Sequence, residues 1–470
     1  MMKEPLICDE LFQKYFEQDY LHQIFINKVK HSHTRGIDRT DPYQFAIYSS
    51  EQIRIIQKKC LEGTYKFSPY LENLHSKGRN KCPRVIAIPT VRDRIVLIAL
   101  KNIISNIFSE CVPRKLANTY IHDIKKCIIK INPRDYGVLR TDIQNFYGSI
   151  NRDKLIAKIR SKIRSEQLIK LLTQAIQVPI VPKNYKRKEL TNYREEKGIP
   201  QGLSISNILS SIYINDIDRY IMEGSQCSYF RYVDDILVIS RIDDLDNIKN
   251  MIDSKLGEIN LSLHNSREKH HQNTANIPFD YLGYSFKIPQ ITIKQSNIDK
   301  FIDSIAAKFS DYLYNKDNKL RIHKYLNESL LKEVFILELN EKITGAISDN
   351  RRYGWLFYFN AINDLSLLYK LDKIIIQMFE RLSEFNQEAP QNLKKLSKAF
   401  YEAKYNTQSD YIHNYNEYKT IQDKICFLKA RGKLDPDKQY TEDQINELYE
   451  KTKARYLAKL DKDDAMIKYG

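Results

Sequence analysis

The sequence predicts an α+β protein that combines antiparallel strands with amphipathic helices. Apolar residues recur at helical spacing in several segments, which indicates helices with one buried face. Two runs rich in aromatic and β-branched residues, Tyr229–Val233 and Ile236–Ile239, are typical of strands. The acidic pair between them, Asp234 and Asp235, falls where a two-residue turn would join the strands into a hairpin. Since 470 residues exceed what one core usually fills, we expect two or three subdomains.

The composition indicates a globular protein with a basic surface. Hydrophobic residues make up 42% of the chain and charged residues 29%, which excludes a disordered protein. The formal net charge of +16 favours a polyanionic partner. A membrane surface, or solubility alone, would produce the same charge, so composition leaves the partner open.

Cysteine usage and hydropathy predict a soluble protein of a reducing cytoplasm. The seven cysteines are odd in number and scattered, without a C-x-x-C pair, so we expect neither a disulfide framework nor a structural zinc site. The N-terminus lacks the apolar core of a signal peptide. The best apolar run, Ile95–Phe108, is interrupted by Lys101 and Asn102, so no membrane association is expected.

The first third of the chain is predicted to be mainly helical, with one cationic hairpin. Helical spacing covers 11–30 and 51–60. A strand of alternating pattern, Arg84–Ile88, ends at Pro89 and is followed by a helix. Basic residues precede this strand and could hold a triphosphate, although a solvated charged loop is the simpler interpretation. They are Lys77, Arg79, Lys81 and Arg84.

A third acid precedes the hairpin in the chain. Val138–Ile143 has the pattern of a buried strand, with Asp142 near its C-terminal end. A lone Asp there could simply cap the next helix. Together with Asp234 and Asp235, however, it would complete a site for two metal ions, of the kind that holds the attacking and leaving oxygens in phosphoryl transfer. Two adjacent carboxylates repel each other unless a cation relieves them, and Mg²⁺ prefers such oxygen ligands.

A glycine- and proline-containing loop lies between these acids. It runs over 198–209 and continues into a helix that reaches about Met222. Its small residues Ser204, Ser206 and Ser210 would let another group approach the first turns closely. A well-capped helix start would account for the same residues.

These segments, taken in chain order, resemble the palm and fingers of reverse transcriptases. The matching elements are Asp142-x-x-x-Phe146-Tyr147-x-x-Ile150, Pro200-Gln201-Gly202 and Tyr232-Val233-Asp234-Asp235. Further elements are similar to those of group II intron and retron enzymes, so that the resemblance covers about residues 30–385. They are Gly36-Ile37-Asp38, Arg84–Pro89 with Asp93-Arg94, Asn265–Lys269, Tyr281-Leu282-Gly283-Tyr284 and Gly354–Tyr358.

Two departures from group II enzymes narrow the resemblance. The segment 102–131 lacks their Tyr-Gly-x-Arg-Pro pattern, and the C-terminus lacks their zinc-finger endonuclease. The chain instead ends in a charged helical segment, in which Thr441-Glu442-Asp443-Gln444 is a capping box. The helix that follows should bury one face. Its buried residues are expected to be Ile445, Leu448, Tyr449, Tyr456 and Leu460. This plan looks most like bacterial defence-associated reverse transcriptases of the abortive-infection type.

The resemblance implies a right-hand polymerase fold with a helical C-terminal extension. Fingers would occupy 1–135, the palm 136–290 with a fingers-like insertion near 155–197, the helical thumb 291–385 and the extension 386–470. It also implies RNA-directed synthesis of cDNA from dNTPs with two Mg²⁺ ions, or Mn²⁺ in their place. The expected partners are an RNA template, preferably a dedicated structured non-coding RNA, and the DNA product. The oligomeric state stays open, with a homo-oligomer among the options.

The resemblance assigns a role to each candidate residue. Asp142 and Asp234 would be the chief metal ligands and catalytic acids, assisted by Asp235 and by the backbone carbonyl of Ile143. Lys269 would protonate the departing pyrophosphate. Tyr147 would exclude a 2′-hydroxyl from the nucleotide site. The remaining nucleotide-binding residues would be Lys81, Arg84, Phe146, Gln201 and Gly202, and the primer grip would be Tyr281, Leu282 and Gly283.

Other functions compete with this one. A diguanylate cyclase shares a palm-like fold but should show Gly-Gly-Asp/Glu-Glu-Phe at its turn, where this chain has Tyr-Val-Asp-Asp. A catalytically dead palm should have lost at least one of the acids, and none is missing. A retron or mobile-element enzyme, and untemplated or protein-primed synthesis by the same site, both stay open. For protein priming, the C-terminal tyrosines would offer hydroxyls, although helix packing is the simpler role for such rings. These are Tyr401, Tyr405, Tyr411, Tyr415 and Tyr418.

Overall fold

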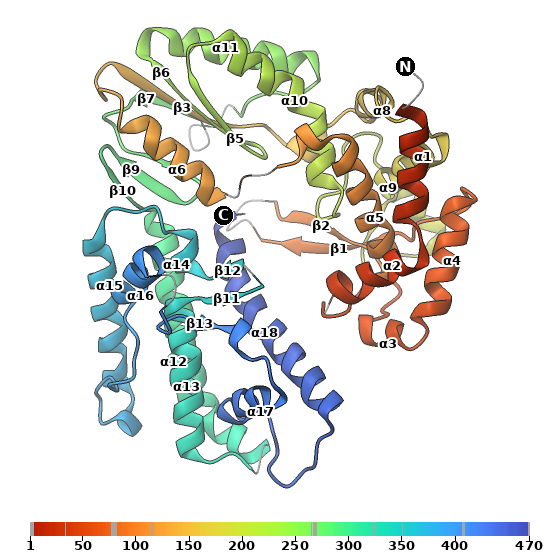
Figure 1. The fold of residues 1–470 in the computed structure, drawn as a ribbon. Helices are drawn as coiled ribbons and strands as arrows, with labels where there is room; N and C mark the ends of the chain where they lie inside the picture. The colour runs from red at the N-terminus through yellow and green to blue at the C-terminus, as the bar shows by residue number, and fades with distance from the viewer. Residues whose placement is uncertain are drawn as a thin grey trace. The chain divides into compact units, whose positions relative to one another are not determined.

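Helices and mainly antiparallel sheets alternate along the chain, which confirms the α+β class (Figure 1). The computed structural model describes residues 4–470 apart from 33, 77–81, 114, 116, 265, 267–269, 323–324, 350, 407–408 and 469–470. The chain divides into two compact units, Met1–Arg114 with Arg134–Ala275, and Lys115–Pro133 with Asn276–Gly470. Among the residues that the structure describes, no helix is both long enough and apolar enough to cross a bilayer.

The first unit contains helices from the N-terminal region and from the middle of the chain. The expected helix over 11–30 is broken near Glu17, and a π-helical turn, Phe25–Val29, ends it. The helices are α1 (Glu4–Tyr15), α2 (Gln18–Ile24), α3 (Pro42–Ala46), α4 (Ser49–Leu61), α5 (Val91–Ile107), α7 (Phe146–Ser149), α8 (Arg152–Arg160), α9 (Glu166–Gln177), α10 (Ser206–Gly224) and α11 (Leu245–Glu258). The strands are β1 (Tyr70–His75), β2 (Arg84–Ile88), β3 (Tyr136–Asp142), β4 (Ile180–Val181), β5 (Ser228–Tyr232), β6 (Asp235–Arg241) and β7 (His271–Thr274).

A four-stranded antiparallel sheet of order β5-β6-β3-β7 is the centre of this unit. Alternate residues of the central strands, including Leu139 and Val238, belong to the main apolar core, to which α10 and α11 also contribute. Because side chains alternate between the faces of a strand, Asp142 and Asp235 share the opposite face. Helices α10 and α11 thus cover one face of the sheet (Figure 1), and the strand register places the acids on the other.

A second sheet joins the N-terminal region to a distant segment. Strands β1 and β2 pair antiparallel, and β4 adds to β1 in parallel, with Tyr70 opposite Ile180. Residues about 110 positions apart therefore share one small sheet. This sheet supports β2, the strand expected to face the triphosphate.

The second unit contains the primer-grip hairpin, the long helices of the expected thumb and the C-terminal segment. Its helices are α6 (Ala117–Ile128), α12 (Gln295–Ile322), α13 (Glu328–Thr344), α14 (Trp355–Tyr358), α15 (Leu365–Gln377), α16 (Leu396–Tyr405), α17 (Ile421–Ala430) and α18 (Glu442–Lys468). Its strands are β8 (Phe279–Tyr281), β9 (Tyr284–Lys287), β10 (Gln290–Ile293), β11 (Ala346–Ser348), β12 (Arg351–Tyr353) and β13 (His413–Asn414). Residues 115–133, which we expected among the fingers, pack in this unit.

The capping box at the start of α18 is confirmed. The Thr441 N–H donates to Gln444 Oε1 over 3.0 Å, and the Gln444 N–H donates to Thr441 Oγ1 over 3.3 Å. The face predicted for this helix is also the buried one, with Tyr449 and Leu460 among its core residues and Leu448 partly buried.

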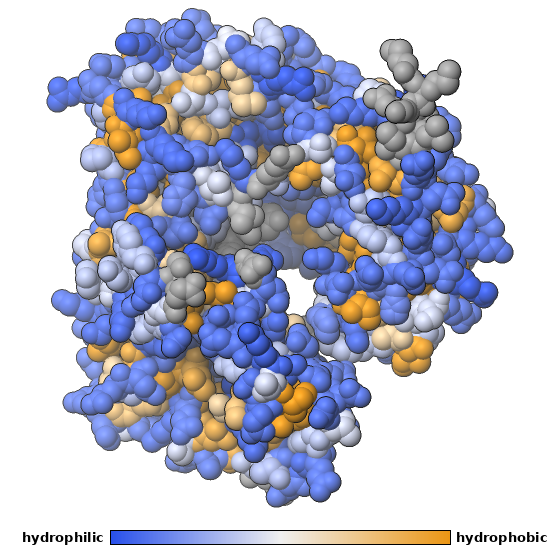
Figure 2. Space-filling model, viewed as in Figure 1, coloured by the Kyte–Doolittle hydropathy of each residue, from blue (hydrophilic) through white to orange (hydrophobic). Residues whose placement is uncertain are grey.

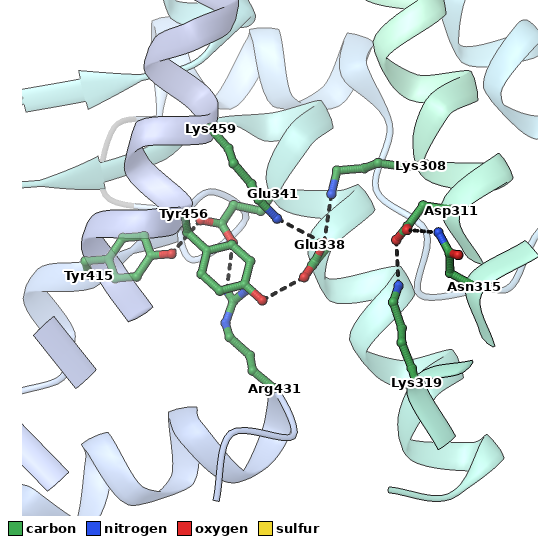
Figure 3. A network of polar contacts seen from close by, with 10 residues as sticks. All are labelled: Lys308, Asp311, Asn315, Lys319, Glu338, Glu341, Tyr415, Arg431, Tyr456 and Lys459. Atoms are coloured by element: carbon green, nitrogen blue, oxygen red, sulfur yellow. Dashed lines mark hydrogen bonds and ion pairs between the residues drawn. The ribbon is translucent and has the colours of Figure 1, made fainter. Parts of the chain in front are cut away.

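The C-terminal segment is joined to β11 by strand pairing and to α13 by ion pairs. Strand β13 pairs with β11, and Arg431 forms a buried ion pair with Glu341 of α13 over 2.7 Å. Figure 3 shows Tyr415 on the same carboxylate, while the neighbouring Glu338 receives Lys308, Lys459 and Tyr456. The segment that the sequence suggested to be an appended extension thus packs against α13 and α14. On the face seen in Figure 2, hydrophilic residues predominate and hydrophobic ones form small patches.

Candidate active site

Two of the three acids face each other on neighbouring strands. The register of β3 and β6 pairs Asp142 with Asp235, and the next pair is Thr141 with Ile236. Cα atoms of directly opposed residues in an antiparallel pair lie about 4.5–5.5 Å apart. The Asp142 side chain is buried and that of Asp235 is about one-third exposed. The sheet therefore holds one shielded and one accessible carboxylate side by side.

The turn of the hairpin lies one residue earlier than the sequence pattern suggested. Tyr232 pairs with Asp235, so Val233 and Asp234 form the turn and Asp235 is already the first residue of β6. The N–H of Ile143 donates to the Asp234 carbonyl over 3.0 Å, which ties the turn to the residue after Asp142. All three acids consequently lie at the same end of the sheet.

The turn has a strained backbone. Val233 has a φ of 58°, in the left-handed region that β-branched residues rarely occupy. Such conformations cost about 1–3 kcal/mol and persist only where the surroundings enforce them. Here Arg231 contributes, because its Nη1 donates to the Val233 carbonyl over 2.7 Å.

A buried ion pair anchors Arg231 behind the turn. Its Nε donates to the two carboxylate oxygens of Asp218, on α10, over 2.8 and 3.0 Å, and Nη2 donates to one of them as well. The Tyr229 hydroxyl donates to Asp218 over 2.9 Å. The side chains of Arg231 and Asp218 are only 11% and 13% exposed. Sequence reasoning missed this pair, and its one signal was a cation within an otherwise apolar strand.

The donor set suits a hard divalent cation. Three carboxylates and the nearby backbone carbonyl of Ile143 are the oxygen ligands that Mg²⁺ accepts. Among the described residues, no three acidic, histidine or cysteine side chains converge closely enough to hold a metal ion by themselves. One oxygen of Asp235 lies 4.0 Å from Arg140 Nη2, a cation that reduces the repulsion between the acids.

Tyr147 lies beside the loop that precedes Gln201. The N–H of Ile199 donates to the Tyr147 carbonyl over 2.9 Å, and a Cβ at Gly198 would approach Gly148 Cα to 2.8 Å. Tyr147 is half-buried, whereas Phe146 is buried in the core with its ring 5.6 Å from that of Tyr147. Phe146 therefore packs against Tyr147 in the core, and its contact with the nucleotide stays a prediction.

Gln201 and Gly202 lie against strand β2. The Ala87 N–H donates to the Gln201 carbonyl over 2.7 Å. Gly202 has a φ of 104°, and a Cβ there would come within 2.6 Å of Ile86 Cγ2. Arg84 starts the same strand, about 10 Å along it from Ala87 at the usual rise per residue. The loop and the expected triphosphate strand thus form one surface.

Some predicted site residues cannot be placed beside these. Lys81 and Lys269 lie outside the described residues. Tyr281, Leu282 and Gly283 form the β8–β9 hairpin of the second unit, which is described by itself. Within that unit, the Tyr358 hydroxyl donates to the Leu282 carbonyl over 3.0 Å, and the Lys294 N–H donates to the Gly283 carbonyl over 3.0 Å.

Comparison with known proteins identifies a related segment. Residues 75–286 match the family model described as reverse transcriptase (RNA-dependent DNA polymerase). Protein YkfC of Escherichia coli (strain K12) is 25% identical over 203 residues, which are 41% of this chain and 51% of that protein. The group II intron-encoded protein LtrA of Lactococcus lactis subsp. cremoris is 25% identical over 191 residues, 37% of this chain and 29% of that protein. The chain thus spans about half or less of these relatives.

Solved structures include a telomerase from Candida albicans in complex with a fragment of telomeric RNA. It is 12% identical, with 74% of this chain and 68% of that chain covered and a TM-score of 0.43, which is too low to argue from. Residues 75–286 are therefore similar to reverse transcriptases, and the relatives include a group II intron-encoded protein. The matched segment 75–286 contains all three acids, Tyr147 and the Gln201 loop.

Proposed function

We propose that this protein is an RNA-directed DNA polymerase that makes cDNA from dNTPs. The observation that carries the proposal is the pairing of Asp142 with Asp235, next to Asp234, inside a segment that matches the reverse transcriptase family. Acids gathered at one end of a sheet, one of them accessible to solvent, suit nucleotidyl transfer. Nucleotidyl transfer by a reverse transcriptase is the activity that both the geometry and the comparisons favour.

The carboxylates would hold two Mg²⁺ ions, or Mn²⁺ in their place. Asp142 and Asp234 would be the chief ligands, with Asp235 and the Ile143 carbonyl as secondary ones. When bound, the ions supply Lewis-acid stabilisation of the charge that develops on the phosphoryl group. The contribution of the protein is position, because the β3–β6 register fixes two of the acids and the Ile143 hydrogen bond fixes the turn that carries the third.

The nucleotide would lie between Tyr147 and strand β2. Tyr147 would lie under the sugar and exclude a 2′-hydroxyl, and Gln201 and Gly202 would contact base and template. Arg84, together with Lys81, would face the triphosphate. The proton for pyrophosphate would come from Lys269, and the 281–283 hairpin would hold the primer. The close contacts of the Gln201 loop with Tyr147 on one side and Ala87 on the other support this arrangement.

The decisive experiment compares single acid substitutions with a matched surface control. Asp142→Ala and Asp234→Asn should each reduce dNTP incorporation on a primed RNA template at least a thousandfold, with an unchanged thermal transition. Asp243→Asn should leave activity intact, since Asp243 is exposed beyond the opposite end of β6. Robust metal-dependent synthesis by the Asp142→Ala, Asp234→Asn double variant would refute the proposal.

We further propose a cytoplasmic role in anti-phage defence, with a dedicated structured RNA bound to the protein. The net charge of +16 supports a stable complex with RNA. When the protein is purified at low salt without nuclease treatment, the RNA extracted from it should prove on sequencing to be one dominant species. A random mixture of cellular RNA would argue against a dedicated template.

Protein-primed synthesis is a second candidate, because two C-terminal tyrosines are accessible. Tyr401 and Tyr405 are exposed, whereas Tyr415 is buried and its hydroxyl donates to Glu341. Priming would leave the DNA product covalently attached to the protein. Recovery of labelled DNA with the denatured protein, and its loss in a Tyr401→Phe, Tyr405→Phe variant, would favour this candidate.

A further inference from the structure

Helix α16 presents two adjacent aromatic rings to solvent. Tyr401 and Tyr405 are 59% and 66% exposed, and their ring centroids lie 5.1 Å apart with the planes tilted by 46°. They are four residues apart, so they occupy one face of the helix. A single exposed ring is ordinary on a protein surface, but two rings side by side form an aromatic platform.

Cations from three segments lie near the C-terminal end of α16. Lys404 Nζ lies 5.5 Å from the centroid of the Tyr405 ring. Burial lowers the pKa of Lys125, on α6, and the like charge of the nearby Lys404 lowers it further. At the same end of α16, Arg352 donates from Nη1 to the Ala403 carbonyl over 3.5 Å. Segments far apart in the sequence thus bring positive charges to one place.

Helix capping explains only part of this arrangement. Cations near a helix C-terminus interact favourably with its dipole, which accounts for Lys404 and Arg352. It accounts neither for Lys125, which belongs to another helix, nor for the exposed rings. The same segment buries other rings, since Tyr415 is fully packed and the Tyr411 hydroxyl accepts from the Lys395 N–H over 2.7 Å.

We propose that the α16 surface, formed by Tyr401, Lys404, Tyr405 and Lys125, binds single-stranded RNA. Unpaired bases would stack on the two rings, while the lysines would neutralise backbone phosphates. The bases of a duplex are stacked on each other, so only an unpaired stretch offers its faces to the rings. The proposal deepens the proposed function, because it rests on a polymerase that uses RNA. It assigns part of the RNA contact to Tyr401, Lys404 and Tyr405, which lie outside the family match at 75–286.

The test measures binding of a fluorescently labelled single-stranded RNA of 20 nucleotides to the full-length protein without dNTPs. Stacking contributes about 1–3 kcal/mol per base, so the Tyr401→Ala, Tyr405→Ala variant should bind at least tenfold more weakly. Tyr401→Phe, Tyr405→Phe keeps both rings and should bind within twofold of the parent. Alanine favours helix at exposed positions, so α16 should stay folded.

Two controls separate the surface from general basic binding. Tyr314→Ala removes a ring that is 74% exposed on α12 and should leave affinity unchanged. Lys404→Ala should reduce the slope of log affinity against log salt by about one phosphate contact. Because binding is measured without nucleotides, the result can be read even if polymerase activity fails to appear.

Each outcome decides the proposal. Weak binding by the alanine variant and normal binding by the phenylalanine variant would support stacking. Equal binding by the alanine variant and the parent would overturn it. Equal loss in both variants would also overturn it, because it would show that the hydroxyls and not the rings are needed.

Discussion

Arg231 holds the acidic turn from behind, and its removal leaves all three carboxylates in the chain. Both members of the Arg231–Asp218 pair are almost completely buried. Leaving one such charge without its partner costs about 3–5 kcal/mol. For a unit of this size, that loss should lower the thermal transition by roughly 6–20 °C. Arg231→Met alone should therefore be markedly less stable.

A double variant separates stability from positioning. Asp218→Leu combined with Arg231→Met replaces the ion pair by apolar side chains, which is often neutral or stabilising. The Val233 carbonyl still lacks its charged donor, and a hydrogen bond of that kind is worth about 1.5–3 kcal/mol. If the whole loss enters the reaction barrier, kcat should fall about 10- to 100-fold. KM for dNTPs should change less, because no residue proposed to contact the nucleotide is altered.

The assay pairs thermal unfolding with single-turnover extension of a DNA primer on RNA. Asp216→Asn is the matched control, because this acid is on the same helix but its ion pair with Lys158 is exposed and worth at most about 1 kcal/mol. A stable double variant with the parent's kcat would refute the reasoning, since the turn would then keep its conformation without Arg231.

Other perturbations have equally definite outcomes. Tyr147→Val should admit NTPs, measured as the ratio of kcat/KM for dNTPs and NTPs, and an unchanged ratio would show that the ring is not the gate. Gly202→Ala should raise KM for dNTPs at least tenfold because of its φ and the clash at 2.6 Å, whereas Gly224→Ala, where a Cβ meets open space, should behave as the parent. Burial lowers the pKa of His413 to about 4, so the unfolded chain binds an extra proton between pH 6.5 and 4, and stability of the second unit should fall across that window as pH falls. Burial opposes ionisation of Glu338, but two lysines outweigh it and lower its pKa to about 2, so its contribution is present above about pH 4.5 and is lost as pH falls towards 2. His413→Phe should flatten only the first of these declines in thermal unfolding curves, and an unchanged profile would contradict the assignment.

Local patterns predicted local structure well. The Thr441–Gln444 capping box depends only on residues three apart, and both of its hydrogen bonds are present. The strand around Asp142 agrees within two residues at either end, and the helix after the Gln201 loop ends two residues beyond the predicted Met222. The hairpin turn was misplaced by one residue because Val233, a β-branched residue, adopts a positive φ that propensity argues against.

Tertiary contacts could not be predicted in the same way. Arg231 and Asp218 belong to a strand and a helix, and their pairing depends on how α10 packs against the sheet. The composition of 386–470 suggested an appended extension, but Arg431 and Tyr415 both reach the carboxylate of Glu341. No periodicity within either segment encodes that contact.

The Glu341–Arg431 contact also bears on how the protein is made. Arg431 follows Glu341 by 90 residues. At about 5–20 residues per second, a ribosome needs roughly 5–18 s to supply that partner. During this interval the Glu341 carboxylate lacks its buried partner, so the ion pair between α13 and the C-terminal segment cannot form. Translation speed across the last third of the message should therefore govern how much nascent chain is exposed to chaperones and proteases.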